Sequence, residues 1–219
     1  MPRSLLRLAR RLPLTFALSV SLSASLAAQA LPEPATQTAI GHFMAATQGS
    51  SDATQASLEQ FQALLKAEPG HPLLMSYAGA ATTLKARDAW APWKKMSYAE
   101  DGLAQIDKAL TLLDPAHDQA LYQGTAVSLQ TRFVAANTFL GLPDMFNRGP
   151  RGRQLLDEIQ ASPLFGKAPA GFQGAVLMRA ARQASQAKQG ERARSLYQQI
   201  IERQLPQATE AQAALKDAK

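Results

Sequence analysis

Valine and isoleucine together number only nine among 219 residues, and this scarcity limits the fold more than any other feature of the sequence. A β-sheet depends on β-branched side chains that pack well on its pleated surface. Alanine, leucine and glutamine, which favour helices, are abundant instead. Apolar residues also recur at helical spacing, which predicts amphipathic helices with one buried face each. The clearest runs are Leu58-Phe61-Leu64-Leu65, Leu103-Ile106-Ala109-Leu110-Leu113 and Leu196-Tyr197-Ile200-Ile201. The sequence therefore predicts an all-α fold.

Four prolines mark a repeat along the chain. Pro69, Pro115, Pro163 and Pro206 each follow an apolar helical run, at intervals of 46, 48 and 43 residues. Near-constant intervals of this size are typical of stacked helical units. Alignment on the prolines gives three columns, namely Ala56, Gly102 and Ala193, then Gln60, Ile106 and Tyr197, then Ala63, Ala109 and Ile200. The pattern predicts antiparallel helix hairpins stacked as a short α-solenoid or packed as a bundle.

The repeat resembles the tetratricopeptide (TPR) class of helical repeat proteins. The matching residues are Gly190-Glu191-Arg192-Ala193, Tyr197, Ile200 and Pro206, and again Gly102, Ile106, Ala109 and Pro115. The resemblance implies a curved solenoid whose concave face binds peptides or partner proteins. The unit here is longer than the usual length of about 34 residues. The central segment, residues 77–96, resembles an uncharacterised family of exported bacterial proteins, which implies a compartment but no mechanism.

The first thirty residues are typical of a secretory signal peptide. Arg3, Arg7, Arg10 and Arg11 precede a serine-loosened apolar run, and Ala28-Gln29-Ala30 supplies a cleavage site after Ala30. A retained membrane anchor is the alternative. The predicted product is a periplasmic or secreted protein with no stable membrane span. The predicted organisation is a signal peptide (1–30), an N-terminal helix or linker (31–50), a TPR-like repeat domain (51–206) and a C-terminal helix or tail (207–219).

The charge of the chain limits its possible partners, and the absence of cysteine limits its covalent chemistry. The leader contains four arginines and no acid, so the net charge of +6 falls to +2 when it is removed. A nearly neutral exported chain is not expected to bind nucleic acid. Residues 31–131 carry a net charge of −4 and residues 132–219 a net charge of +6, so an anionic ligand is expected on the second half. The chain has no cysteine, which excludes disulfides and a cysteine-linked lipid.

The first candidate binding site is the segment Trp90–Tyr98, a predicted link between two helices. It holds both tryptophans of the chain, together with Lys94, Lys95 and Tyr98. Indole rings offer stiff contact area and lysines attract carboxylates or phosphates, so the segment is a candidate for a peptide terminus, an anionic glycan or a lipid headgroup. At least one tryptophan is nevertheless expected to be buried between adjacent helix pairs, because large aromatic side chains more often fill cores than bind ligands. Trp93, beside Lys94, is expected to be the more exposed of the two.

The second candidate site is the turn Asn147–Arg153, which holds Arg148, Arg151 and Arg153 just before a predicted helix. Arginines and free N–H groups at a helix start bind phosphates or carboxylates. A solvated basic turn is the favoured interpretation, and the anion site is the alternative. Three further arginines are candidates to extend a positive face, namely Arg132, Arg179 and Arg182.

Local residues also predict helix ends. Ser97 and Glu100 have capping-box spacing, Pro72 suits a first helical turn, and Gly190 is expected to end a helix.

Catalytic and metal-binding patterns are absent from the sequence. His42, His71 and His117 are scattered, and His71 and His117 are expected on the surface because they lie in proline-containing turns. No catalytic residue, cofactor or metal ligand is predicted.

The sequence therefore favours an exported, non-catalytic adaptor that binds a protein or peptide partner in the bacterial cell envelope, with a small anionic ligand as a further option. Two alternatives stay open, a ligand-binding accessory protein of a periplasmic transport system and an enzyme with an unrecognised site. An open groove favours a protein partner, and an enclosed apolar cavity favours a ligand-binding accessory protein of a transport system. A buried histidine or carboxylate with a shifted pKa in a cleft favours an enzyme.

Overall fold

A computed structural model describes residues 31–217 and confirms the predicted all-α fold. The predicted signal peptide and its cleavage after Ala30 lie outside this range. Ten α-helices account for most of the described chain. The α-helices and strands, in chain order, are α1 (Glu33–Thr47), α2 (Ser51–Ala67), α3 (Pro72–Asp88), α4 (Pro92–Thr111), α5 (Ala116–Gln119), β1 (Leu121–Tyr122), β2 (Thr125–Ala126), α6 (Val127–Gly141), α7 (Gly149–Ala161), α8 (Ala170–Gln186), α9 (Gly190–Glu202) and α10 (Ala208–Asp217).

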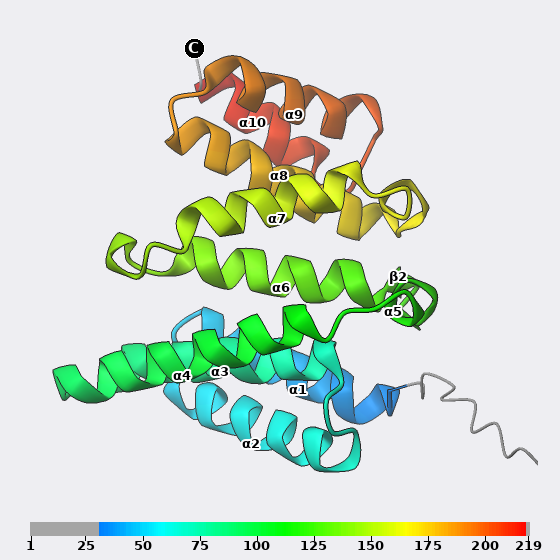
Figure 1. The fold of residues 1–219 in the computed structure, drawn as a ribbon. Coiled ribbons are helices and arrows are strands. Elements are labelled where there is room, and N and C mark those ends of the chain that lie inside the picture. The colour runs from blue at the N-terminus through cyan, green and yellow to red at the C-terminus, as the bar shows by residue number, and fades with distance from the viewer. Residues whose placement is uncertain (1–30, 218–219) are drawn as a thin grey trace, which may run out of the picture.

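The helices form four antiparallel hairpins that stack in chain order (Figure 1). The hairpins are α1–α2, α3–α4, α6–α7 and α8–α9, and α10 packs against α9. Each of the four evenly spaced prolines follows the second helix of a hairpin. The proline spacing therefore marks the structural unit. The domain division expected at residue 50 falls inside the first hairpin, between α1 and α2.

A second pattern, found only in the structure, lies on the second helix of each hairpin. A small buried residue is followed four positions later by a large buried residue and seven positions later by another buried residue. The four sets are Ser57-Phe61-Leu64, Gly102-Ile106-Ala109, Gly152-Leu156-Ile159 and Ala193-Tyr197-Ile200. The proline alignment finds two of these sets but is one residue out of register in α2, where Ala63 is exposed. The distance from the small residue to the proline varies, which hides the pattern in the sequence.

The hairpin α3–α4 is held by direct contact between two backbones. A Cβ atom placed on Gly102 would lie 2.5 Å from the carbonyl oxygen of Gly79, and one on Gly79 would lie 2.6 Å from that of Gly102. Any side chain at either position would separate the helices. This crossing explains why a glycine occupies the middle of two otherwise regular helices, where it costs about 1 kcal/mol relative to alanine.

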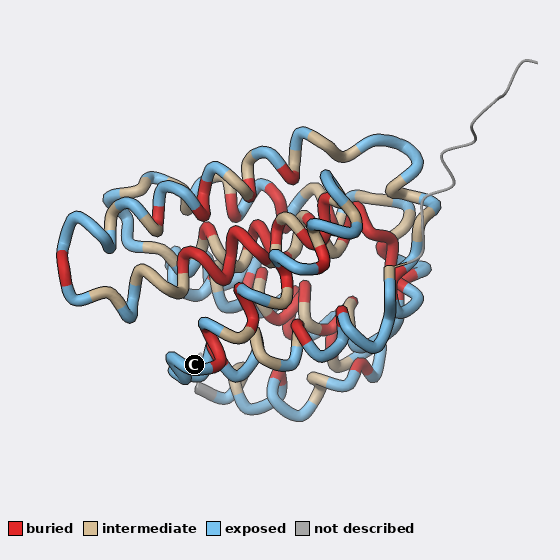
Figure 2. The backbone as a smooth tube through the Cα atoms, turned by 90° about the horizontal axis from the view of Figure 1, so that it is seen from below, coloured by how far each residue is buried: buried red, intermediate tan, exposed pale blue. Residues whose placement is uncertain are grey.

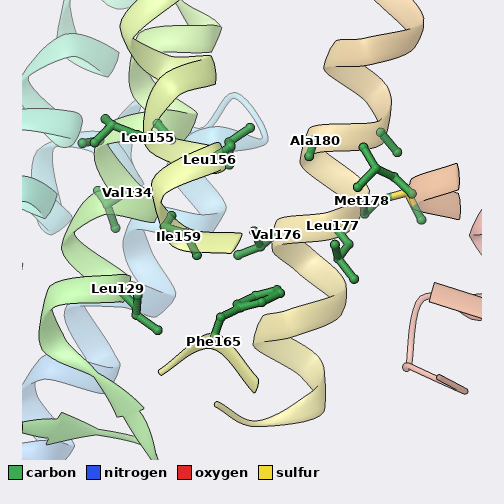
Figure 3. Close-up of a cluster of buried hydrophobic side chains, with 14 of the residues drawn as sticks. Leu129, Val134, Leu155, Leu156, Ile159, Phe165, Val176, Leu177, Met178 and Ala180 are labelled. Atoms are coloured by element: carbon green, nitrogen blue, oxygen red, sulfur yellow. The ribbon is translucent and has the colours of Figure 1, made fainter. Parts of the chain in front are cut away.

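The buried residues form two clusters, which are joined by partly buried residues such as Tyr77. Buried residues lie mainly in the interior of the stack, and exposed residues lie along the outer sides and at the turns (Figure 2). In the second half, Leu156 and Ile159 of α7 face Val176 of α8, and Phe165 lies beside them (Figure 3). In the first half, the ring of Tyr77 stacks on Phe61 with centroids 5.2 Å apart. Burial of these apolar faces stabilises the stack, since each large side chain contributes about 1.5–3 kcal/mol.

Two predicted helix boundaries are wrong and one is confirmed. Pro72 begins α3 as expected. Ser97 and Glu100 form no capping box, because α4 begins five residues earlier at Pro92, where the fixed φ of proline suits a first turn. Gly190 begins α9 and does not end a helix. The left-handed residue after α8 is Lys188, with a φ of 57°.

A two-stranded hairpin before α6 was not predicted. Leu121 pairs with Ala126 and Tyr122 with Thr125. Gln123 and Gly124 both have positive φ, at 48° and 73°. A two-residue hairpin turn of this twist needs positive φ at both positions, and glycine supplies one of them.

Substitution of Gly102 by alanine should destabilise the fold by about 1–3 kcal/mol, because the new Cβ atom forces α3 and α4 apart. The matched control is Gly41→Ala in α1, where a Cβ atom meets nothing within 4 Å. The control should gain about 0.5–1 kcal/mol from helix propensity. Urea unfolding followed by circular dichroism measures both changes, and equal stability of the two variants would contradict the described crossing.

Candidate functional site

The structure divides the segment Trp90–Tyr98 between two sites. Only Ala89, Trp90 and Ala91 link α3 to α4, so most of the predicted link lies in the first turns of α4. We call Trp90–Lys95 the tip. Tyr98 lies about 7 Å from Trp93 along the axis of α4, and it lines a second site, a groove.

Both tryptophans of the tip are exposed. Trp90 is 83% and Trp93 67% accessible, so the expectation that at least one is buried is wrong. The expectation that Trp93 is the more exposed is also wrong. The joined ends of α3 and α4 extend beyond the neighbouring hairpins, so no adjacent helix covers the rings (Figure 1). The two rings contact each other instead, edge to face, with centroids 6.0 Å apart.

The lysines of the tip are exposed and unpaired. Within residues 31–217, neither Lys94 nor Lys95 lies within ion-pair distance of a carboxylate. Arg87, at the end of α3, differs because its Nε lies 3.2 Å from Asp88 and its Nη2 donates to the carbonyl oxygen of Ala46 at 3.0 Å. The tip therefore combines two indole rings with two free positive charges.

The second site is an open groove between α2, α3 and α4, with a volume of about 470 Å³. Its lining residues are Leu58, Gln62, Thr82, Lys85, Tyr98, Asp101, Ala104 and Gln105. The ammonium of Lys85 lies 5.2 Å from the ring centre of Tyr98, within the range of a cation–π contact. It also donates to Gln55 Oε1 at 3.3 Å. These contacts position the ring and the charge along one wall of the groove.

The groove offers polar groups with spare hydrogen-bonding capacity. The side-chain amides of Gln62 and Gln105 make no hydrogen bond to any other part of the described chain. Asp101 accepts a weak hydrogen bond from Ser97 at 3.4 Å and keeps further acceptor capacity. Tyr98 was predicted from the sequence as a binding residue, whereas Gln62, Lys85 and Gln105 were not. These residues lie on three different helices, and nothing in their local sequence indicates that they meet.

The predicted basic turn at Asn147–Arg153 is mostly helical and internally paired. Gly149–Arg153 lies in the first turn of α7. Arg148 binds Asp107 of α4 in a bidentate ion pair, at 3.0 and 2.7 Å. Arg151 pairs with Glu158 at 2.7 Å. Arg148 and Arg151 therefore bind an anion only by breaking an existing ion pair, whereas Arg153 is exposed.

The wider positive face is partly neutralised. Arg132 lies 3.8 Å from Glu158, which also pairs with Arg151, and Arg182 pairs with Glu210. Arg179 has no carboxylate partner among the described residues and donates weakly to a carbonyl oxygen at 3.5 Å. Burial, and then the neighbouring charge of Arg182, lowers the pKa of Arg179. The arginines stabilise contacts between helices and do not gather around one ligand.

His71 is partly buried. Burial, reinforced by the nearby His117, lowers the pKa of His71 to about 4, so His71 lies at the surface only in part. Its Nδ1 atom is buried and makes no hydrogen bond to the described chain. His71 precedes α3 at the end opposite the groove, roughly 16 Å along the helix from Thr82. No group of three or more His, Asp or Glu side chains in residues 31–217 is arranged to hold a metal ion.

Comparison with known proteins leaves the family open. No family model, curated protein or solved structure matches the chain. None of the helices described here has the length and apolar character needed to cross a membrane.

Acid should destabilise the fold partly through His71. Its folded pKa near 4 is below the unfolded value near 6.5, so stability is complete above pH 6.5 and is lost as the pH falls toward 4. Urea unfolding measures the free energy of unfolding at pH 7 and at pH 5. Between these two values, His71→Gln should lose about 1 kcal/mol less of its unfolding free energy than the wild type, after allowance for solvent screening. His71→Asn, which also removes the titrating ring, is the second variant and should show the same reduced pH dependence. An unchanged pH dependence in His71→Gln would contradict the assignment.

Proposed function

We propose that this protein is a non-catalytic helical-repeat adaptor that binds an extended peptide, or an exposed segment of a partner protein, in the groove between α2, α3 and α4. The observation that carries the proposal is the open groove itself. It combines the apolar surfaces of Leu58 and Tyr98 with one cation, one carboxylate and two free amides.

These groups match the chemistry of a peptide. The amides of Gln62 and Gln105 each supply a donor and an acceptor, which complement backbone N–H and C=O groups. Tyr98 offers a rigid ring of the kind that dominates binding energy at interfaces. Lys85 and Asp101 add opposite charges along the groove and select for side chains or termini of complementary charge.

The alternatives receive less support. A small molecule held by a transport accessory protein favours an enclosed apolar cavity, whereas this groove is open to solvent and has polar groups in its lining. An enzyme favours a titratable group with a shifted pKa in the cleft, but His71 lies outside the groove.

The place of action follows from the sequence. The leader of residues 1–30 supports export, and we propose that the adaptor works in the periplasm or outside the cell. The tagged full chain expressed in a Gram-negative host should appear in the periplasmic fraction with Leu31 as its first residue, as determined by N-terminal sequencing. A full-length chain retained in the cytoplasm or membrane would overturn this part of the proposal.

Peptide binding can be tested without a known partner. A phage-displayed library of random peptides is selected against the purified protein, expressed from the full sequence, and the affinity of selected peptides is measured by fluorescence polarisation. Tyr98→Ala and Gln105→Ala should each weaken binding, Tyr98→Ala by about tenfold or more.

The matched control is the double variant Trp90→Ala/Trp93→Ala, which changes neighbouring aromatic residues outside the groove lining. It should retain the affinity of the wild type. Peptides that bind Tyr98→Ala as tightly as the wild type, or a library that yields no binder, would contradict the proposal.

A further inference from the structure

The tip carries an exposed apolar surface that the groove does not use. Trp90 and Trp93 are 83% and 67% accessible, and neither lines the groove. Two large aromatic side chains exposed side by side on a folded chain indicate an interaction site, because their hydration is unfavourable. The tip is therefore a candidate binding surface that is separate from the groove.

The backbone that carries the exposed rings is anchored to the fold. Ala91, between them in the chain, is fully buried, which attaches the link to the body of the protein. The rings pack edge to face at an interplanar angle of 70°. The hydrogen bond from Arg87 to Ala46 ties the end of α3 to the end of α1. A preorganised surface of this kind loses little conformational entropy when it binds.

The charge beside the rings indicates an anionic partner. Lys94 and Lys95 follow Trp93 directly, are exposed, and have no carboxylate partner within residues 31–217. The positive charge of Arg87 is balanced by Asp88. The exposed lysines therefore give the tip a local charge of +2, although residues 31–131 as a whole are acidic.

The shape of the tip favours a flat partner. The joined ends of α3 and α4 project from the stack, as Figure 1 shows, so a planar surface can reach both rings without touching the other hairpins. Indole rings prefer the interface of a bilayer, and lysines beside them contact lipid phosphates. We propose that the tip binds peripherally to an anionic lipid bilayer, with Trp90 and Trp93 at headgroup depth and Lys94 and Lys95 against the phosphates.

The chain provides a direct spectroscopic test. Trp90 and Trp93 are its only tryptophans, so intrinsic tryptophan fluorescence reports on the tip alone. Vesicles of phosphatidylglycerol mixed with phosphatidylcholine should shift the emission maximum of the protein to the blue. Vesicles of phosphatidylcholine alone should give a much smaller shift, because the attraction of the lysines is lost.

Variants separate the tip from other sources of binding. In vesicle co-sedimentation, Trp90→Ala/Trp93→Ala should lose binding, and Lys94→Gln/Lys95→Gln should weaken it about tenfold or more, since each lysine contributes roughly fivefold at an anionic surface. The charge-matched control is Lys66→Gln/Lys108→Gln, which removes two exposed lysines away from the tip and should bind as the wild type does. All proteins are compared as the chain recovered from the periplasmic fraction, which we propose begins at Leu31, so that the arginine-rich leader does not itself bind the vesicles.

The outcomes are decisive. Loss of binding in both tip variants, with wild-type binding in the lysine control and in Tyr98→Ala, supports the proposal. Equal binding by the wild type and Trp90→Ala/Trp93→Ala, or an emission maximum unchanged by anionic vesicles, overturns it. A crosslinked protein seated on the tip in the absence of vesicle binding would also overturn it, because it would identify a different occupant. Peptide binding by the groove is measured separately and fails or succeeds independently.

Discussion

The contact between the backbones of Gly79 and Gly102 determines the arrangement of the first half of the molecule. With no side chain between them, α3 and α4 approach until the missing Cβ atoms would overlap the opposing carbonyl oxygens. This closeness makes α3–α4 the most closely packed hairpin of the described chain. Gln105 of α4 lies beside this crossing, because a Cβ atom on Gly79 would lie 3.1 Å from the Cβ atom of Gln105, and Gln105 also lines the groove. The crossing and the groove are therefore neighbours on the same hairpin.

The same principle repeats along the stack with different residues. Gly152 brings α7 against α6, where a Cβ atom would lie 2.7 Å from Leu140 and 3.2 Å from the carbonyl oxygen of Ala136. Long-range ion pairs then join successive hairpins. Arg148 at the start of α7 binds Asp107 of α4, and the Arg148 guanidinium also lies 5.3 Å from the ring centre of Phe139. The basic turn in the sequence therefore has a structural role, which links the acidic first half to the basic second half.

The features that could be predicted from the sequence are those set by local periodicity. Leu103, Ile106 and Ala109 share a helical face in any context, and a proline after each such face ends the unit. What could not be predicted depends on residues far apart in the chain. Asp107 and Arg148 are 41 positions apart, and no local pattern pairs them. The exposure of Trp90 and Trp93 depends on the neighbouring hairpins being shorter, a comparison that the sequence of one hairpin does not contain. Tyr98 was predicted because it follows the tryptophans in the sequence. Its neighbours in the groove, Gln62 of α2 and Lys85 of α3, stand in no local sequence pattern that predicts a binding role.

The two proposed surfaces lie on one rigid hairpin, and this has a geometric consequence. Trp93 and Tyr98 are five positions apart in one continuous helix, a distance of about 7–8 Å along the axis. A tip at headgroup depth would therefore hold the near end of the groove close to the bilayer surface. The segments most accessible to such a groove are those that emerge from a membrane or approach it. Because Trp93 of the tip and Tyr98 of the groove lie on the same continuous helix, the fold sets the orientation of the groove relative to the tip. Membrane attachment would then restrict which partners reach the groove through geometry alone, without any contact between the lipid and the peptide.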